Sequence, residues 1–451
     1  MYLVYKGIIR SVIDYGCEAY GGATASQKKK LDSIQYKALS IITGSMVTTS
    51  LTSLQVECGE PSLELRRVLF VNKYKVYLQS RKETHPTKQI LTPCWQYEYF
   101  HWKQGEGPFV NRASPIEWPD IEKQSDCTAR IPYWHYDKVN VSFTLNQQIN
   151  KKNTLPAEQL SLTKELIANK WDNYLKIYTD ASKLSDGRMG AAFYLPKFKI
   201  CKKYRVTSVC IMRAELTAIL LALTWIEENI STPVVILSDS LSSLQALQNV
   251  EGSSIVLQII DKYTNMSRRG IDIHLEWIPS HCGVHGNEVV DSLAKEGALL
   301  DLTEIRIPTS KKEAVSHLKH HQVEKWQSEW ETSDTGRHLF HIQPKVKESV
   351  KLYNLNRREE KIVHRLRLGK CNLNHYKHTI NKHNTGLCEI CQDPETVEHV
   401  LLQCKKFTKE RKKMLLQLKR KTITVEELLR NNNYFSALIH FIKAIGYYDS
   451  L

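Results

Sequence analysis

Four acidic residues stand where an α/β sheet would bring them to one place. Asp180 and Asp239 each end a short apolar segment, Glu215 lies in the opening turn of a predicted helix, and Asp291 lies within another. Ligands of such sheets bind at the edge where strand ends converge. Carboxylates gathered there repel one another unless hard divalent cations neutralise them, which predicts Mg²⁺, with Mn²⁺ as an alternative. Two such ions can clamp a phosphodiester for hydrolysis.

Taken singly, these acids have ordinary explanations. Glu215 could interact with the helix dipole, and Asp239 could cap the helix that begins with SLSSLQAL. A catalytic role for these acids therefore depends on all four lying together.

The elements around these acids predict a mixed α/β layer. Period-two and β-branched apolar segments predict strands, and segments with apolar residues at helical spacing predict helices. The order is three strands, a helix, a strand, two helices, a strand and a helix, which gives a five-stranded mixed sheet with flanking helices. The strands are expected at 175–180, 189–195, 199–208, 234–239 and 271–277, and the helices at 212–229, 240–248, 255–268 and 285–300.

Four motifs in this stretch resemble those of type 1 ribonuclease H, in order and at suitable spacing. They are IYTDASK (177–183), RAELTAILLAL (213–223), ILSDSLSSLQAL (236–247) and WIPSHCGVHGNEVVDSLAK (277–295). The resemblance implies a ribonuclease H-like fold and two-metal-ion cleavage of the RNA strand of an RNA–DNA hybrid. It implies further that Asp180, Glu215, Asp239 and Asp291 hold the ions, with Asp180 bridging both.

Two further residues receive roles from the resemblance. His281 stands where the family has a mobile histidine that moves a proton or helps product leave, and Asn287 matches an asparagine that meets the hybrid. A histidine titrates near neutrality, which suits proton exchange. Two alternatives stay open: a nucleic-acid-binding remnant without activity, and a transposase-like or exonuclease-like protein. Position 182 is Ser, whereas an exonuclease of this fold would need a second acid there.

The N-terminal residues 1–80 have helical periodicity and a second resemblance. YKGIIRSVIDYGCEAYGG (5–22), LDSIQYKALSIITG (31–44) and LQVECGEPSLELRR (54–67) are similar to the region after the polymerase palm in reverse transcriptases of non-LTR retrotransposons. This implies a thumb-like segment in the C-terminal part of a retrotransposon polyprotein. The chain has no Tyr/Phe-x-Asp-Asp box, so polymerisation is not expected, and the missing polymerase portion becomes a candidate partner.

Near the other end, Cys388, Cys391, His399 and Cys404 have the spacing of a closed, tetrahedral Zn²⁺ site. The module at 388–404 also resembles the terminal Cys/His module of these retroelement proteins. The alternative is a small helical hairpin whose cysteines are simply buried. The odd count of 11 cysteines argues against a disulfide framework.

Charge is distributed unevenly along the chain. The net charge of +15 divides into +6 for residues 1–170, −1 for 171–300 and +10 for 301–451. Basic flanks around a nearly neutral centre favour contacts with a nucleic acid backbone, and the basic runs at 361–370 and 405–421 are expected to contact phosphates rather than merely face solvent.

Four regions are predicted from these patterns. They are a thumb-like helical segment (1–80), a connector (81–170), a ribonuclease H domain (171–301) and a basic helical tail (302–451). The N-terminus does not have the pattern of a secretory signal, and no apolar run is long enough to span a membrane, so an intracellular protein is expected, in either the nucleus or the cytoplasm.

Overall fold

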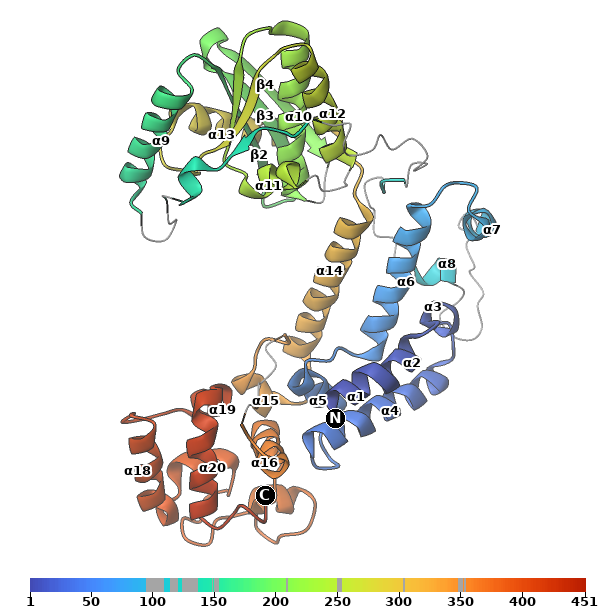
Figure 1. The fold of residues 1–451 in the computed structure, drawn as a ribbon. Coiled ribbons are helices and arrows are strands. Elements are labelled where there is room, and N and C mark those ends of the chain that lie inside the picture. The colour runs from blue at the N-terminus through green and yellow to red at the C-terminus, as the bar shows by residue number, and fades with distance from the viewer. Residues whose placement is uncertain are drawn as a thin grey trace. The chain divides into compact units, whose positions relative to one another are not determined.

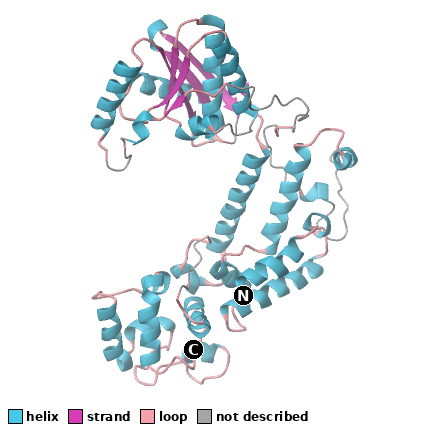
Figure 2. Cartoon of the chain, in the orientation of Figure 1, coloured by secondary structure: helices cyan, strands magenta, loops and turns pink. Residues whose placement is uncertain are grey.

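The computed structural model describes residues 1–94, 109–113, 121–123, 137–147, 149, 154–207, 210–249, 254–302, 305–347, 352 and 354–451. The chain divides into two compact units, which Figures 1 and 2 show as a sheet-containing part and a helical part. The sheet unit comprises Val76–Gln89 and Pro115–His317. The helical unit comprises Met1–Lys75, Ile90–Ser114 and Leu318–Leu451. Among the described helices, none is long and apolar enough to cross a membrane.

The sheet unit contains a seven-stranded mixed sheet in the order β1-β6-β5-β2-β3-β4-β7. The five predicted strands form its centre, and the two-residue strands β1 and β7 extend its edges. β2 pairs antiparallel with β3, and β3 with β4, whereas all other pairs are parallel. The bounds are β1 (Val141–Ser142), β2 (Leu175–Lys183), β3 (Met189–Leu195), β4 (Ile200–Thr207), β5 (Val234–Ser238), β6 (Ile273–Trp277) and β7 (Ile305–Arg306).

Helices cover both faces of this sheet, as expected for strands that are apolar almost throughout. Ile177 and Ile236 belong to the core that includes α10 (Ile211–Asn229) and α12 (Ser254–Arg268). Their neighbours Tyr178 and Leu237 belong to the opposite core, beneath α13 (His285–Ala298). Figure 1 shows α10 and α12 on one side of the sheet and α13 on the other. The short helix α11 (Leu241–Gln248) follows β5.

The segment before β2 adds a helix that the sequence did not predict. α9 (Pro156–Lys170) begins with a proline at its first position, which is a favoured helix start, and has an acid in its first turn. Leu162 and Leu166 pack against the α10 side of the core. The apolar periodicity over 81–170 is weak, so α9 was not predicted, although its first turn contains the proline and the acid that are typical of a helix start.

The helical unit joins segments from both ends of the chain. Trp326, Trp330 and Leu368 share one apolar core with Leu39 and Leu54. Its elements are α1 (Tyr2–Val4), η1 (Tyr5–Arg10), α2 (Ser11–Asp14), α3 (Cys17–Tyr20), α4 (Ala25–Thr43), α5 (Leu51–Cys58), α8 (Phe109–Arg112), α15 (Arg337–Ile342), α16 (Arg357–Leu368), α17 (Asn374–Thr379), η6 (His399–Gln403), η7 (Lys405–Phe407), α18 (Thr408–Gln417), α19 (Val425–Arg430), η8 (Asn432–Tyr434) and α20 (Phe435–Ala444). Three further helices have residues in both units: α6 (Leu63–Gln79), α7 (Pro86–Cys94) and α14 (Lys311–Thr332).

A buried ionic network joins α5 to α16. Glu57 is fully buried and accepts hydrogen bonds from His364 Nδ1 at 2.7 Å and Arg367 Nε at 2.9 Å. Burial alone would raise the pKa of Glu57, but Arg367 and His364 lower it to about 2. Arg365 is also used internally, since its Nε donates to the carbonyl of Gly44 at 2.7 Å. The expectation that the basic run at 361–370 contacts phosphates is therefore wrong for Arg365 and Arg367, because tertiary contacts occupy both guanidinium groups.

Candidate active site

The pairing of β2 with β5 brings two of the predicted acids side by side. Thr179 is in register with Ser238 across this parallel pair. The next residue of each strand is therefore Asp180 in β2 and Asp239 just beyond β5. Both side chains stand at the carboxyl edge of the sheet, where the sequence analysis placed them.

Glu215 completes a compact group of three carboxylates. One oxygen each from Asp180, Glu215 and Asp239 lies within 4.8 Å of the others. Asp180 and Glu215 are buried, with 6% and 8% of their surfaces exposed. Asp291, the fourth predicted acid, is outside this trio but close enough to raise the pKa of Asp180. The structure thus brings three of the acids together and places the fourth beside them.

The proximity of these acids makes ionisation costly in the metal-free protein. Burial raises the pKa of Asp180 to about 8, with Asp239 and Asp291 adding to the effect. Burial likewise raises the pKa of Glu215, and Asp180 and Asp239 raise it further. Among the described residues, Glu215 Oε2 is buried without a hydrogen-bond partner.

This donor set fits hard divalent cations. Mg²⁺ and Mn²⁺ prefer carboxylate oxygens, and a cation would neutralise the mutual repulsion that raises both pKa values. It would also supply a partner for the buried Glu215 oxygen. Asp180, Glu215, Asp239 and Asp291 are the residues that would hold such ions.

Three neighbours form hydrogen bonds with these acids, two through the carboxylate and one through the backbone, and these contacts were not predicted from the sequence. Trp277 Nε1 donates to the backbone carbonyl of Asp239 at 3.1 Å. Asn287 Nδ2 donates to Asp239 Oδ2 at 3.2 Å. Lys295 Nζ pairs with Asp291 Oδ2 at 2.7 Å. Only the last contact had a sequence signal, since Asp291 and Lys295 are four residues apart on one helix.

Asn287, predicted to meet the substrate, is almost fully buried in this structure. Its exposed fraction is 2%, and its Oδ1 atom has no hydrogen-bond partner among the described residues. The observed contact is with Asp239, so Asn287 reaches the site through a carboxylate. Its predicted contact with a hybrid stays a prediction.

His281 lies in the loop between β6 and α13, where the sequence analysis expected a mobile histidine. It is exposed and has a left-handed backbone conformation, with φ of 52°. A ring nitrogen of His281 lies within 4.8 Å of oxygens of Glu288 and Asp291. The histidine is therefore beside the fourth acid, within the reach of a proton exchange at this edge.

Glycine makes the start of α13 fit against the sheet. A Cβ atom at Gly286 would lie 2.2 Å from the ring of Tyr178 in β2. A second close approach lies farther along α13, at Ala294. A Cβ atom at Gly190 in β3 would lie 2.1 Å from the carbonyl oxygen of this residue. These close approaches hold α13, and with it Asp291, against the strands that carry the other acids.

Comparison with known proteins agrees with this geometry. The family model described as RNase H matches residues 172–299. This part of the chain is an RNase H domain. The match spans β2 to α13 and contains all four acids, and the mixed sheet with flanking helices is the predicted fold. The RNase H family consists of nucleases that act on RNA–DNA hybrids, which is the class of hydrolase that the motifs implied.

Outside the RNase H domain, the four predicted zinc ligands do come together. Their donor atoms lie within 4.8 Å of one another. The sulfur of Cys404 is 3.8 Å from that of Cys388 and 3.9 Å from that of Cys391. Sulfurs bound to zinc at about 2.3 Å in a tetrahedron are about 3.8 Å apart, so the spacing fits this ion. Both ring nitrogens of the buried His399 are without a partner among the described residues, so one of them is free to bind a metal ion.

The surroundings of this Cys/His cluster favour a structural role. Cys388 and Cys404 belong to the apolar core of the C-terminal helices. The backbone amide of Lys405 donates to Cys391 Sγ at 3.3 Å, which lowers the pKa of that thiol. Bound zinc would cross-link the loop that carries Cys388 and Cys391 to the two ends of η6, at His399 and Cys404.

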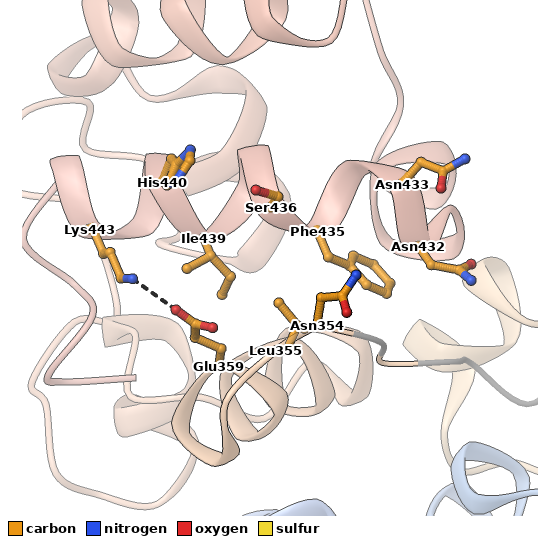
Figure 3. A pocket seen from close by; sticks show the side chains of 10 residues that line it. All are labelled: Asn354, Leu355, Glu359, Asn432, Asn433, Phe435, Ser436, Ile439, His440 and Lys443. Carbon is orange, nitrogen blue, oxygen red and sulfur yellow. Dashed lines mark hydrogen bonds and ion pairs between the residues drawn. The ribbon is translucent and has the colours of Figure 1, made fainter.

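A separate hollow of about 600 Å³ lies between the start of α16 and α20 (Figure 3). An ion pair between Glu359 and Lys443, 2.8 Å long, closes one side of it. None of the predicted site residues lines this hollow. It therefore has no part in either the acidic site or the Cys/His site.

Proposed function

We propose that the RNase H domain hydrolyses the RNA strand of RNA–DNA hybrids, using two Mg²⁺ ions held by Asp180, Glu215, Asp239 and Asp291. The observation that supports this most directly is the trio of carboxylates at the edge of an RNase H sheet, in which Asp180 and Glu215 are buried and one Glu215 oxygen is unsatisfied among the described residues. When bound, paired ions activate a water molecule and stabilise the leaving oxygen. Mn²⁺ has the same preference for oxygen ligands and is the expected substitute.

The chain's own residues have distinct tasks in this proposal. Asp180, whose carboxylate lies within 4.8 Å of those of Glu215 and Asp239, would contact both ions, as the resemblance implies. Asn287 and Lys295 keep Asp239 and Asp291 in position through the hydrogen bond and ion pair described above. His281 is exposed, with a ring nitrogen within 4.8 Å of an Asp291 oxygen, and in this proposal it would exchange a proton at this edge of the site.

Selectivity for a hybrid would depend on backbone shape and RNA 2′-hydroxyls rather than on bases. Strand β4 presents the exposed Lys202 and Lys203, although Lys203 is paired with Glu296. Beyond the Cys/His cluster, exposed lysines at 405, 406, 409, 412 and 413 surround α18 and supply positive charge for a nucleic acid backbone. These contacts would be independent of sequence and weakened by salt.

The test is cleavage of a 5′-labelled RNA–DNA hybrid by the full chain in Mg²⁺. We expect cleavage of the RNA strand, and at least about 100-fold less by Asp239→Asn, because the remaining ligands bind the ions poorly. Asp186→Asn, at an exposed turn of the same domain, is the matched control and should retain full activity. Equal rates for the Asp239→Asn variant and the original chain would contradict the assigned roles, and absence of cleavage by both would favour the inactive remnant.

We also propose a context for the domain on the strength of the sequence resemblances. Residues 1–80 would be a thumb-like segment, residues 81–170 a connector, and residues 302–451 a zinc-stabilised basic tail of a retrotransposon polyprotein. The polymerase portion of that polyprotein would be a partner, and the protein would act inside the cell. Binding of a purified polymerase portion to this chain, measured by titration, tests the partnership.

A further inference from the structure

The helix that carries Glu215 has a buried arginine in its first turn. Arg213 is the third residue of α10 and is only 2% exposed. Its Nη1 atom lies 3.4 Å from Glu122 Oε2 and 3.2 Å from Glu313 Oε2. In the part of the chain that the structure describes, these two acids are its ion-pair partners. Because a buried charge is costly when it is left unpaired, the start of α10 depends on both of them.

Both acids lie outside the residues that match the RNase H family. The match covers residues 172–299 and includes Arg213. Glu122 precedes this stretch, and Glu313 belongs to the first turn of α14, which follows it. The matched stretch therefore contains a buried positive charge whose described counter-charges come from the flanking segments.

The segment that leads to Glu313 is built into the sheet and its core. Strand β7 extends the sheet by pairing parallel with β4. The next residue, Ile307, is 5% exposed and shares an apolar core with Ala214 of α10 and Ala181 of β2. Ala214 and Ala181 are direct neighbours of two of the acids along the chain. The segment after the matched residues thus packs against the elements that carry Asp180 and Glu215.

The Glu313 carboxylate is fixed where it meets Arg213. Glu313 Oε2 accepts hydrogen bonds from the backbone amide of Ser310 at 2.9 Å and from its hydroxyl at 2.6 Å. The Ser310 hydroxyl in turn accepts from the backbone amide of Glu313 at 3.2 Å. This reciprocal arrangement is a capping box at the start of α14. It limits the freedom of the carboxylate, so that Glu313 can hold the guanidinium group in one place.

Glu122 ties the preceding segment to the same place. Its backbone amide donates to the carbonyl of Thr309 at 2.8 Å, beside a parallel bridge between Ile121 and Thr309. Its Oε1 atom accepts from the backbone amide of Ser254, the first residue of α12, at 3.0 Å. Glu122 therefore connects the start of α12 and the segment after β7 to Arg213.

We propose that Glu122 and Glu313 are positioning residues of the metal site, which act through Arg213 to place Glu215 beside Asp180. This inference rests on the proposed metal-dependent function. At about 100° per residue, Arg213 and Glu215 point to roughly opposite sides of α10. One side of the first turns is thus anchored by the flanks while the other presents the metal ligand. Groups that orient metal ligands typically contribute about 10- to 100-fold to metal affinity.

The first test is Mn²⁺ binding to the full chain without substrate, measured by electron paramagnetic resonance of the free ion. The relevant binding is the part that Asp239→Asn removes. Glu313→Gln should weaken it about 10-fold, because Arg213 loses one of its two counter-charges. Glu324→Gln, at an exposed position of the same helix α14, is the matched control and should leave the affinity unchanged. Unchanged affinity in both Glu313→Gln and Glu122→Gln would overturn the proposal.

A double-mutant cycle tests the route through Arg213. If Glu313 acts through this arginine, then Glu313→Gln should have little further effect on Mn²⁺ affinity in an Arg213→Met chain. The two losses would then be far from additive. Fully additive losses would mean that Glu313 influences the site by another route, and would contradict the proposed role of Arg213.

Hydrogen exchange of the metal-free chain separates this inference from the proposed function. Glu313→Gln should speed exchange in the first two turns of α10 at least about 10-fold and leave its last turns and β5 unchanged. Uniformly faster exchange across the domain would mean a general loss of stability and would contradict a positioning role. An original chain that neither binds Mn²⁺ nor cleaves a hybrid would refute the proposed nuclease, whereas the exchange pattern would still decide whether the two acids hold α10.

Discussion

Replacement of Asp180 by asparagine should stabilise the metal-free RNase H domain, although it should abolish activity. In the folded chain burial, with Asp239 and Asp291, raises the pKa of Asp180 from 3.8 to about 8. The folded state thus keeps a proton that the unfolded chain loses near pH 4. The free energy of unfolding must then fall as the pH rises between these two values.

The magnitude follows from the size of this shift. At pH 7 the unfolded carboxyl is about three pH units above its pKa while the folded one is still mostly protonated, which corresponds to about 4 kcal/mol at 1.36 kcal/mol per unit. Rearrangement of the acids and entry of water reduce the penalty of a buried charge. We therefore expect Asp180→Asn to gain about 2 kcal/mol at pH 7 and almost nothing at pH 4.

Native-state hydrogen exchange of the full chain is the appropriate assay, because peptides from β2 and α10 report the opening of this domain alone. Measurements at pH 5 and pH 7 without Mg²⁺ give the pH dependence after correction for intrinsic exchange. Glu228→Gln, at an exposed position of α10, is the control and should change little. Added Mg²⁺ should stabilise the original chain more than the variant. Equal protection of the variant and the original chain at pH 7 would refute the reasoning, because it would mean that burial and the neighbouring carboxylates do not raise the pKa of Asp180 in the folded chain.

Two further predictions concern the zinc cluster and the packing of α13. Cys404→Ser should lose the bound zinc that metal analysis detects, and it should lower the melting temperature of the helical unit. Cys201→Ser, at an exposed cysteine, is the control and should change neither. A zinc-free protein with an unchanged melting temperature would contradict a structural ion. Gly190→Ala should destabilise the RNase H domain by about 2–3 kcal/mol in urea denaturation, because the new Cβ meets the backbone of α13. Gly187→Ala, at an open turn with positive φ, should cost about 1 kcal/mol through backbone strain alone. Equal losses of stability for the two variants would show that β3 and α13 do not approach so closely.

Local patterns predicted the strands and helices of the RNase H domain to within a few residues. Apolar alternation in β2 and β5 and the helical spacing in α10 depend on which side of an element is buried, and that information is written residue by residue. The spacing of Cys388, Cys391, His399 and Cys404 was similarly readable, because a metal site on a short loop needs ligands that are near in sequence.

Contacts between distant segments were not readable in this way. The sequence of a basic run does not show whether its arginines bind phosphates or other groups of the protein. The packing of α16 against the N-terminal helices shows that Arg365 and Arg367 form hydrogen bonds within the protein. Equally, the sequence identified Asn287 but not its orientation toward Asp239.

The sequence by itself determined the elements of the domain, the acids that could bind metal, and the four residues that could bind zinc, because each depends on residue type and local spacing. Only the tertiary structure decided that three carboxylates, two of them buried, come together with Asp291 beside them, and that segments from both ends of the chain share one helical unit. These features depend on which surfaces meet after the chain has folded, and local periodicity does not specify those partners.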